Sequence, residues 1–369
     1  MDKTDSIILM YHKGLHENNG TSIYLNNMLK ALSKNFNVIV PSESFFKKRI
    51  GKTNKWIAKA IGVNLYLIGW VLLNSVRKRN KFKIIIAEDR YVVIPTILLK
   101  FVSSAKLIIR VSDWGKKYID TIPINKLIKT FLSLYSSLFH FIAIKVASSI
   151  IVPSENMKEE IAHKFKGNIF ILPYMAKELE IYKGNNPTYP DANVIKNEIC
   201  AIFVGDCRYP PNFNSAAFLT SEVAPKLQRL DDNIRILIAG PGSNRFFGNL
   251  PNNVTVLGEI DDLGSVFAKC HIGINPSVTF GGTSIKNIEY LLNGLLVITT
   301  SESSIGVINT SRLIISKRED FAQTIYALAT QLRAGLNVSS DEEEISRIRE
   351  YYSSDRNSQL LINFVSAIA

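Results

Sequence analysis

A pair of adjacent glycines opens the segment with the clearest chemical potential. Gly281 and Gly282 leave the backbone N–H groups of their loop bare. A helix is expected directly after them, because Thr283 and Ser284 both favour the position before a helix. A helix N-terminus carries partial positive charge and, with free N–H groups beside it, binds phosphate. The segment therefore predicts a phosphate site.

Two charged side chains follow in the first turns of this helix. Lys286 would add a full positive charge to the phosphate site, and the carboxylate of Glu289 could accept hydrogen bonds from sugar hydroxyls. Either residue could also be an ordinary solvated side chain on a helix surface. Their position directly after the glycine pair favours a binding role for both.

The flanking residues place this segment in a nucleotide-binding type of domain. Apolar residues in 272–274 predict a strand before the glycines, and 295–300 predict another directly after Gly294. The helix between them has one apolar face, formed by Ile285, Ile288, Leu291 and Leu292. The order strand, glycine loop, helix, strand is half of a nucleotide-binding α/β domain.

The same order of elements opens the chain. Residues 6–11 predict a buried strand, a polar loop leads to Gly20 and Thr21, and a helix and a strand at 38–40 follow. The loop lies where such folds bind ligands, although it lacks the GxGxxG pattern.

Two further predicted strands end in charged residues. Residues 84–87 run into Glu88, Asp89 and Arg90, and residues 106–111 are followed by Asp113. Ligands bind at the carboxyl ends of parallel strands, so two such ends on one sheet predict a cleft. Taken singly, each acid also fits a helix cap or a surface turn.

The chain of 369 residues is too long for one typical domain. Because both halves share the same order of elements, we expect an α/β fold with two Rossmann-like domains facing across a cleft. The predicted boundaries are an N-terminal domain at 1–175, a polar linker at 176–198, a C-terminal domain at 199–350, and a final helix at 351–369 that can pack back on the N-terminal domain.

The composition is that of a globular protein, with 46% hydrophobic and 21% charged residues. The three cysteines, Cys200, Cys207 and Cys270, form no CxxC pair. We therefore expect neither a disulfide framework nor a zinc site, and a reducing compartment such as the cytoplasm. The first residues lead straight into a strand, so no signal peptide is expected.

Positive charge is concentrated in the first half of the chain. Residues 1–180 contain 28 Lys and Arg and 13 Asp and Glu, a net charge of +15, whereas residues 181–369 contain 16 and 19, a net charge of −3; together they give +12. This asymmetry suggests a membrane surface, a lipid-linked phosphate or a nucleic acid as partner, with a generally basic chain as the alternative. No element interleaves Arg with aromatic residues, which disfavours nucleic acid.

Two basic clusters within 45–83 flank an apolar run at 61–73. The run is shorter than the roughly 20 residues that span a bilayer, so we do not expect a transmembrane helix. Two interpretations stay open: a buried helix with solvated ends, or a helix at the membrane interface that uses Trp56, Tyr66 and Trp70.

Several stretches together resemble the GT-B-fold glycosyltransferases of the "glycosyl transferases group 1" family. They are Phe203–Gly205, Tyr209–Asn212, Ile236–Gly240, Val254–Gly258 with Asp261, and Gly281–Glu289 with Gly294 and Val297. The resemblance covers most of residues 199–310 and reaches the first half only in outline. It implies transfer of a sugar, a hexose in particular, from a nucleotide-diphosphate donor to an acceptor hydroxyl with retention of configuration, and without metal or other cofactor.

The resemblance also implies roles for individual residues. It assigns donor binding to the C-terminal domain and acceptor binding to the N-terminal domain, with Glu88, Asp89 and Arg90 as candidates on the acceptor side. It implies catalytic roles for Asp113, which would position the acceptor, and Lys286, which would stabilise the leaving diphosphate. The donor-binding residues that it implies are Gly20, Thr21, Gly205, Arg208, Gly240, Gly281, Gly282, Thr283, Ser284, Lys286 and Glu289.

The sequence departs from the family pattern at three positions. Gly281 stands where many members have Glu, and Asp206 and Asn212 stand where many have Arg and Lys. Our hypothesis is that Arg208 and Lys286 replace this missing pair of cations.

The expected function is that of a glycosyltransferase in cell-surface polysaccharide or glycolipid synthesis, cytoplasmic and peripheral at the inner face of the membrane. Its partners would be a nucleotide sugar, a lipid-linked or saccharide acceptor and an anionic membrane surface, with no nucleic acid. Two alternatives stay open: a sugar-nucleotide epimerase of the same fold, and a non-catalytic partner subunit.

Overall fold

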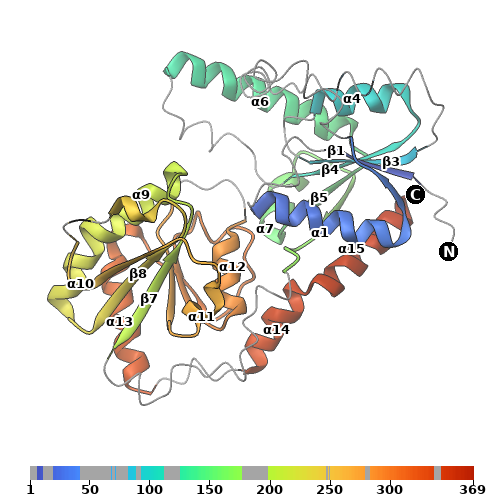
Figure 1. Cartoon of the computed structure of the whole chain (residues 1–369). Helices are drawn as coiled ribbons and strands as arrows, with labels where there is room; N and C mark the ends of the chain where they lie inside the picture. Colours follow the sequence, from blue (N-terminus) through green and yellow to red (C-terminus); the bar gives the residue numbers. More distant parts are fainter. Residues whose placement is uncertain are drawn as a thin grey trace. The chain divides into compact units, whose positions relative to one another are not determined.

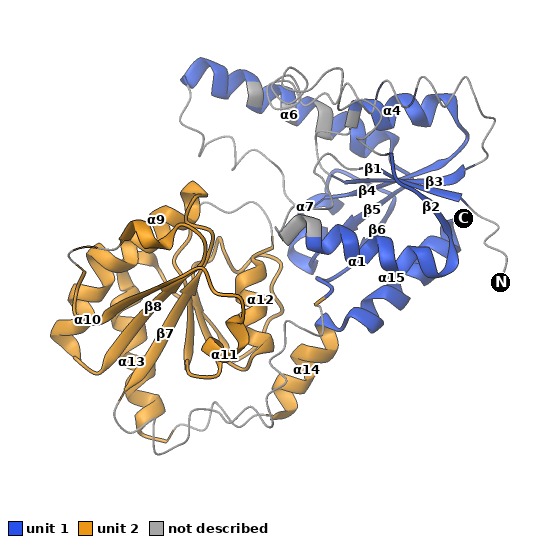
Figure 2. Cartoon of the chain, viewed as in Figure 1, with its two compact units in different colours: residues 1–175, 352–369 blue, residues 176–351 orange. Residues whose placement is uncertain are grey.

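The chain forms two compact units, each with its own sheet. Unit 1 consists of residues 1–175 and 352–369, and unit 2 of residues 176–351 (Figure 2). The computed structural model describes residues 6–10, 20–41, 68, 71, 82–88, 93–111, 125–176, 198–246, 248, 250–278, 283–335 and 342–369.

Unit 1 is built on a parallel six-stranded sheet in the order β2-β1-β3-β4-β5-β6. Figure 2 labels the six strands. The middle residues of its central strands are apolar and buried, as expected of a sheet covered on both faces. The strands are β1 (Ser6–Met10), β2 (Asn37–Ile39), β3 (Phe82–Glu88), β4 (Lys106–Arg110), β5 (Ser149–Val152) and β6 (Asn168–Ile171).

The helices of unit 1 include the end of the chain. They are α1 (Gly20–Asn35), α4 (Val93–Val102), α6 (Lys126–Val146), α7 (Glu155–Ala162) and α15 (Ser354–Ile368). Phe364 of α15 stacks on Phe170 with ring centroids 4.2 Å apart, and Asn357 donates to the Tyr174 carbonyl over 3.1 Å. These contacts pack α15 against the rest of unit 1.

Unit 2 contains a second parallel sheet, in the order β12-β11-β10-β7-β8-β9. The chain builds β7, β8 and β9 outward in one direction and then returns to build β10, β11 and β12 in the other. The strand order therefore reverses between β7 and β10. The strands are β7 (Ile199–Val204), β8 (Ile234–Ala239), β9 (Val254–Gly258), β10 (Ile272–Asn275), β11 (Leu296–Thr299) and β12 (Leu313–Ile315).

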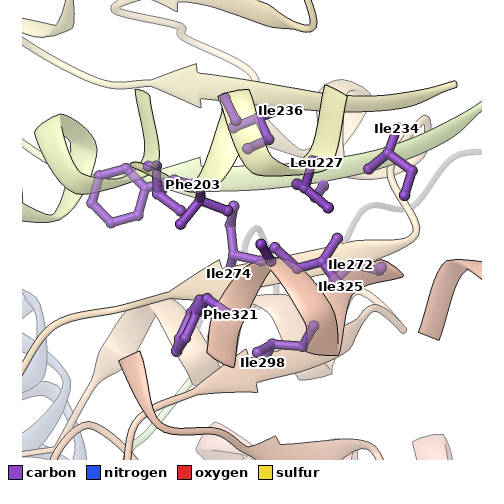
Figure 3. Close-up of a cluster of buried hydrophobic side chains, with 14 of the residues drawn as sticks. Phe203, Leu227, Ile234, Ile236, Ile272, Ile274, Ile298, Phe321 and Ile325 are labelled. Atoms are coloured by element: carbon purple, nitrogen blue, oxygen red, sulfur yellow. The ribbon is translucent and has the colours of Figure 1, made fainter. Parts of the chain in front are cut away.

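A large apolar cluster between the sheet and α10 and α13 is one part of the core of unit 2. Phe203 and Ile274 of the sheet lie near Phe321 and Ile325 of α13 in Figure 3, and all four side chains are buried. The helices and helical turns are α9 (Pro210–Phe218), η4 (Leu219–Val223), α10 (Ala224–Leu230), η5 (Ser243–Phe246), α11 (Leu263–Phe267), α12 (Ile285–Leu292), η6 (Arg318–Asp320), α13 (Phe321–Arg333) and α14 (Glu342–Tyr352).

The two sheets confirm the predicted α/β class with two Rossmann-like units. Helix α9 begins at Pro210, because proline is tolerated in a first helical turn. The short strand β12 was not predicted. Nearly all of the expected linker, and most of the basic segment at 45–83, lie outside the described residues. No described helix is both long and apolar enough to cross a bilayer.

Candidate functional site

The reversal of strand order in unit 2 marks the edge where this fold type binds ligands. Strands β7 and β10 are parallel neighbours, with Ile272 opposite Ala201. Their carboxyl ends, at Val204 and Asn275, therefore lie at the same edge of the sheet. The loops that follow β7 and β10 carry most of the residues predicted to bind the donor.

The loops after β7 and β8 pack backbone to backbone at this edge. Gly205 donates its N–H to the Ala239 carbonyl over 3.0 Å, and Cys207 donates to the Pro241 carbonyl over 2.8 Å. Gly240 has a φ of 121°, and a Cβ atom there would lie 2.3 Å from the Gly205 carbonyl oxygen. Glycine at 240 is thus required by both conformation and space.

Replacing Gly240 by alanine is expected to destabilise the protein by about 2–3 kcal/mol, through positive φ and collision with the Gly205 carbonyl. Gly335→Ala is the matched control, because Gly335 also has positive φ but has no atom within 4 Å of the added Cβ. Gly335→Ala should lower the free energy of unfolding by only about 1 kcal/mol. Denaturant unfolding of both variants measures the difference, and equal losses would contradict the close approach at Gly240.

Helix α12 is held against the sheet by Tyr290. Its hydroxyl accepts the Val204 N–H over 2.8 Å, which ties the helix to the end of β7. Its ring covers Gly273 of β10, where a Cβ would lie 2.3 Å from the ring. The contacts fix α12 over the two strands at which the strand order reverses.

A buried polar network fixes the beginning of α12. The Asn275 amide donates to Ser284 Oγ and to Asn287 Oδ1, both over 2.9 Å. The Asn287 amide in turn donates to Thr299 Oγ1 over 3.0 Å and to the Ser303 carbonyl over 2.8 Å. Ser284 does occupy the N-cap position, but its hydroxyl makes no capping bond to the helix.

Three polar atoms at this edge are buried without a hydrogen-bond partner among the described residues. They are Asn275 Oδ1, Ser277 Oγ and Thr283 Oγ1. Buried polar groups are nearly always satisfied in native proteins, so a cluster of exceptions indicates a place where a ligand or water binds.

Lys286 extends from the first turn of α12 to the loop after β7. Its Nζ donates to Asn212 Oδ1 over 2.8 Å and lies 4.2 Å from the centre of the Phe203 ring. Burial lowers the pKa of Lys286 to about 7, since desolvation disfavours the ammonium form. The amine is therefore about half protonated at pH 7, and a bound anion would favour its charged form.

Asn212, the partner of Lys286, stands at one of the positions where the sequence departs from the family that it resembles. Position 212 is where many members carry Lys, and here the side chain at 212 holds the amine of Lys286 instead. Asn212 also donates to the Asp206 carbonyl over 3.1 Å, which fixes the loop that it faces. The sequence alone did not single out Asn212 as a partner of Lys286.

Arg208 is exposed and paired with a carboxylate. Its guanidinium donates to both oxygens of Asp206 over 2.8 Å, and this contact lowers the pKa of the Asp206 carboxyl. Arg245 of η5 lies near enough to lower that pKa further. The Arg208–Asp206 pair carries no net charge, so the added positive charge near this loop comes from Arg245, which the sequence analysis missed.

Of the residues predicted to bind the donor, the structure brings one group together. Gly205, Arg208 and Gly240 lie just after the ends of β7 and β8, and Lys286 of α12 contacts this group. Glu289 is on α12 as well, and Thr283 and Ser284 directly precede the helix. Glu289 is half-buried one turn after Lys286. Gly281 and Gly282 lie outside the described residues.

In unit 1, Gly20 and Thr21 form the start of α1, which supports the predicted loop-to-helix position. Glu88 at the end of β3 is buried and forms an ion pair with Arg110 at the end of β4. This pair joins two adjacent strand ends, and the proposed contact of Glu88 with an acceptor stays a prediction. The other acceptor-side candidates, Asp89 and Arg90, and the catalytic candidate Asp113 lie outside the described residues.

Comparisons with known proteins agree with this architecture. Residues 198–331 match the family model "Glycosyl transferases group 1". Comparison of the sequence with curated proteins found no match.

Solved structures share the fold at low sequence identity. Sucrose-phosphate synthase from Thermosynechococcus elongatus superimposes with a TM-score of 0.72 at 12% identity, covering 99% of both chains. Anabaena HepE in complex with UDP and glucose gives 0.66 at 11% identity over 98% of this chain and 100% of that one. An Escherichia coli structure titled trehalose-6-phosphate, bound with UDP-2-fluoro glucose, gives 0.59 at 12% identity over 99% of both chains.

Proposed function

We propose that this protein is a glycosyltransferase that moves a hexosyl group from a nucleotide-diphosphate sugar to an acceptor hydroxyl. The observation that carries the proposal is the position of Lys286. A half-buried amine in the first turn of α12, at the edge where the strand order of unit 2 reverses, is suited to a diphosphate. The family match over residues 198–331 supports the reaction class.

The donor class is supported by the structures that share this fold. HepE is described in complex with UDP and with UDP-glucose, and the Escherichia coli structure is described as bound with UDP-2-fluoro glucose. In the proposed complex the diphosphate lies at the N-terminus of α12, beside Lys286, and Glu289 accepts hydrogen bonds from ribose hydroxyls. No cofactor other than the donor takes part.

The proposed reaction exchanges two bonds at the anomeric carbon. The bond to the diphosphate oxygen breaks, the acceptor oxygen forms the new bond, and the acceptor proton leaves with the diphosphate or a nearby base. Negative charge grows on the leaving diphosphate, and the cation at Lys286 with the helix dipole would stabilise it. We propose Asp113 as the group that positions the acceptor, and retention of configuration, which fits catalysis by positioning and electrostatics.

The proposed setting is synthesis of a cell-surface polysaccharide or glycolipid at the inner face of the cytoplasmic membrane. The net charge of +15 over residues 1–180 supports an anionic membrane surface or a lipid-linked acceptor as the partner.

Donor turnover measured over UDP-, GDP- and ADP-sugars tests the proposal and its two alternatives. Release of nucleoside diphosphate, raised by an acceptor, is the expected result. Conversion of the sugar without release of the nucleotide would indicate an epimerase. Binding without any turnover would indicate a partner subunit.

Donor affinity should depend on pH because the pKa of Lys286 is lowered to about 7 in the free protein. A bound diphosphate favours the ammonium form and raises this pKa, so affinity is highest where Lys286 is protonated and the diphosphate is fully ionised. It should fall as pH rises above 7, by up to about tenfold per unit until the pKa of the complex is reached. Calorimetric titration of the nucleoside diphosphate between pH 7 and 9 measures the slope. An affinity that stays constant over this range would contradict the role of Lys286.

A further inference from the structure

Helix α6 carries a stripe of large apolar side chains that no described residue covers. Leu127, Phe131, Leu134, Leu138 and Phe141 are between 55% and 79% exposed. Their spacing of four, three, four and three residues places all five on one face of the helix. Single exposed apolar residues are common, but a continuous stripe four turns long marks an interaction surface.

The neighbouring helix α4 also exposes apolar side chains. Leu98, Phe101 and Val102 lie on one face of α4 and are exposed as well. The two helices lie beside each other in unit 1 (Figure 1). Helix α6 is anchored through its last turns, where Ala143 and Ile144 are buried. The α6–α4 surface is defined here by Leu98, Phe101, Val102, Leu127, Phe131, Leu134, Leu138 and Phe141.

The charges on these two helices all have the same sign. Neither α4 nor α6 contains an Asp or a Glu, while α6 has Lys126 and Lys129 at its start and Lys145 near its end. The Lys145 amine lies 5.5 Å from the centre of the Phe141 ring, so a cation adjoins the apolar stripe directly. An apolar face with lysines at its borders is complementary to anionic headgroups above acyl chains.

We propose that the α6–α4 surface docks on an anionic lipid bilayer, with its apolar side chains in the headgroup–acyl boundary and its lysines on lipid phosphates. A second copy of the chain is the competing occupant, since the stripe has the spacing of a helix pair. Pairing two copies of this surface would set lysines against lysines without a carboxylate on either helix, which disfavours the dimer. The proposal does not depend on the transferase activity.

Vesicle flotation of the full chain tests the docking. We expect co-flotation with phosphatidylcholine vesicles that contain phosphatidylglycerol, little with phosphatidylcholine alone, and release by high salt. The double variant Leu134→Glu/Leu138→Glu should reduce partitioning on the order of a hundredfold. Two leucines that would enter the bilayer are replaced by anions that anionic lipid repels. Lys126→Glu/Lys145→Glu should also weaken it, by roughly thirtyfold or more, because each substitution removes an attraction to the lipid phosphates and adds a repulsion.

The matched control places the same change on unit 2. Leu230 and Ile315 are exposed apolar residues there, and Leu230→Glu/Ile315→Glu should leave flotation unchanged. All variants should keep the unfolding temperature of the wild type, because the substituted side chains are exposed. The proposal is overturned if wild type does not float with anionic vesicles, if the α6 variant floats as well as the control, or if sedimentation without lipid shows a dimer that the α6 variant dissociates.

Discussion

Replacing Lys286 by methionine is expected to lower donor turnover by about 10²–10³-fold, the usual effect of removing one preorganised group that faces developing charge. Methionine keeps most of the volume of the side chain and removes only the charge and the bond to Asn212. The affinity for nucleoside diphosphate should fall as well, because the cation acts on both the bound and the leaving diphosphate.

The same substitution should not destabilise the fold. The pKa of Lys286 is about 7 in the folded chain, whereas the ordinary value of a lysine, 10.5, applies to the unfolded chain. The unfolded chain therefore binds the proton more tightly. The charged amine therefore disfavours folding below pH 7, and the stability of the wild type rises with pH between about 7 and 10.5. Lys286→Met should remove this dependence and unfold no earlier than wild type at pH 7.

Lys226→Met is the matched control, since Lys226 is an exposed lysine on a helix of the same unit. Steady-state kinetics and thermal unfolding of both variants measure the effect. If Lys286→Met kept wild-type turnover and donor affinity, the proposed role of Lys286 would be wrong.

Replacing Asn287 by leucine is expected to lower the free energy of unfolding by about 3–5 kcal/mol, because it leaves several buried polar partners unsatisfied. The Asn287 side chain is fully buried, and it bonds to Asn275, Thr299 and Ser303. Leucine has a similar size but can replace none of these bonds.

Donor affinity should also fall in the Asn287 variant, because the network sets the position of the first turn of α12. Asn214→Leu is the control: Asn214 is exposed on α9, and its replacement should change stability by less than about 0.5 kcal/mol. Urea unfolding of the two variants compares them. An Asn287→Leu protein as stable as the control would show that the network contributes little.

The periodicity of apolar residues was enough to predict most of the fold. The alternation of buried strands with helices in both halves predicted two Rossmann-like units, and the glycines at 240 and 294 marked real turns with positive φ. The place of the candidate phosphate site in the chain was predictable for the same reason, and phosphate binding there stays a prediction. Its position after a strand, before a helix, follows from local chain geometry.

The contacts that organise the site could not be predicted from local patterns. Lys286 and Asn212 are 74 residues apart in the chain, and only the pairing of β7 with β10 brings their elements together. Asn287 stands among apolar residues of α12, and an amide on an otherwise apolar helix face indicates a buried hydrogen-bonding group. Its partners, however, come from two strands and a loop, which the sequence does not reveal. Sequence spacing carries no information about such contacts.

The central claim is that the carboxyl edge between β7 and β10 binds the diphosphate of a nucleotide sugar. A crystal structure with the nucleoside diphosphate that binds most tightly tests it most directly. We predict a phosphate oxygen within hydrogen-bond distance of Lys286 Nζ and of backbone N–H groups in the first turn of α12. A nucleotide whose phosphates lie away from α12, with Lys286 still bonded to Asn212 alone, would contradict the account.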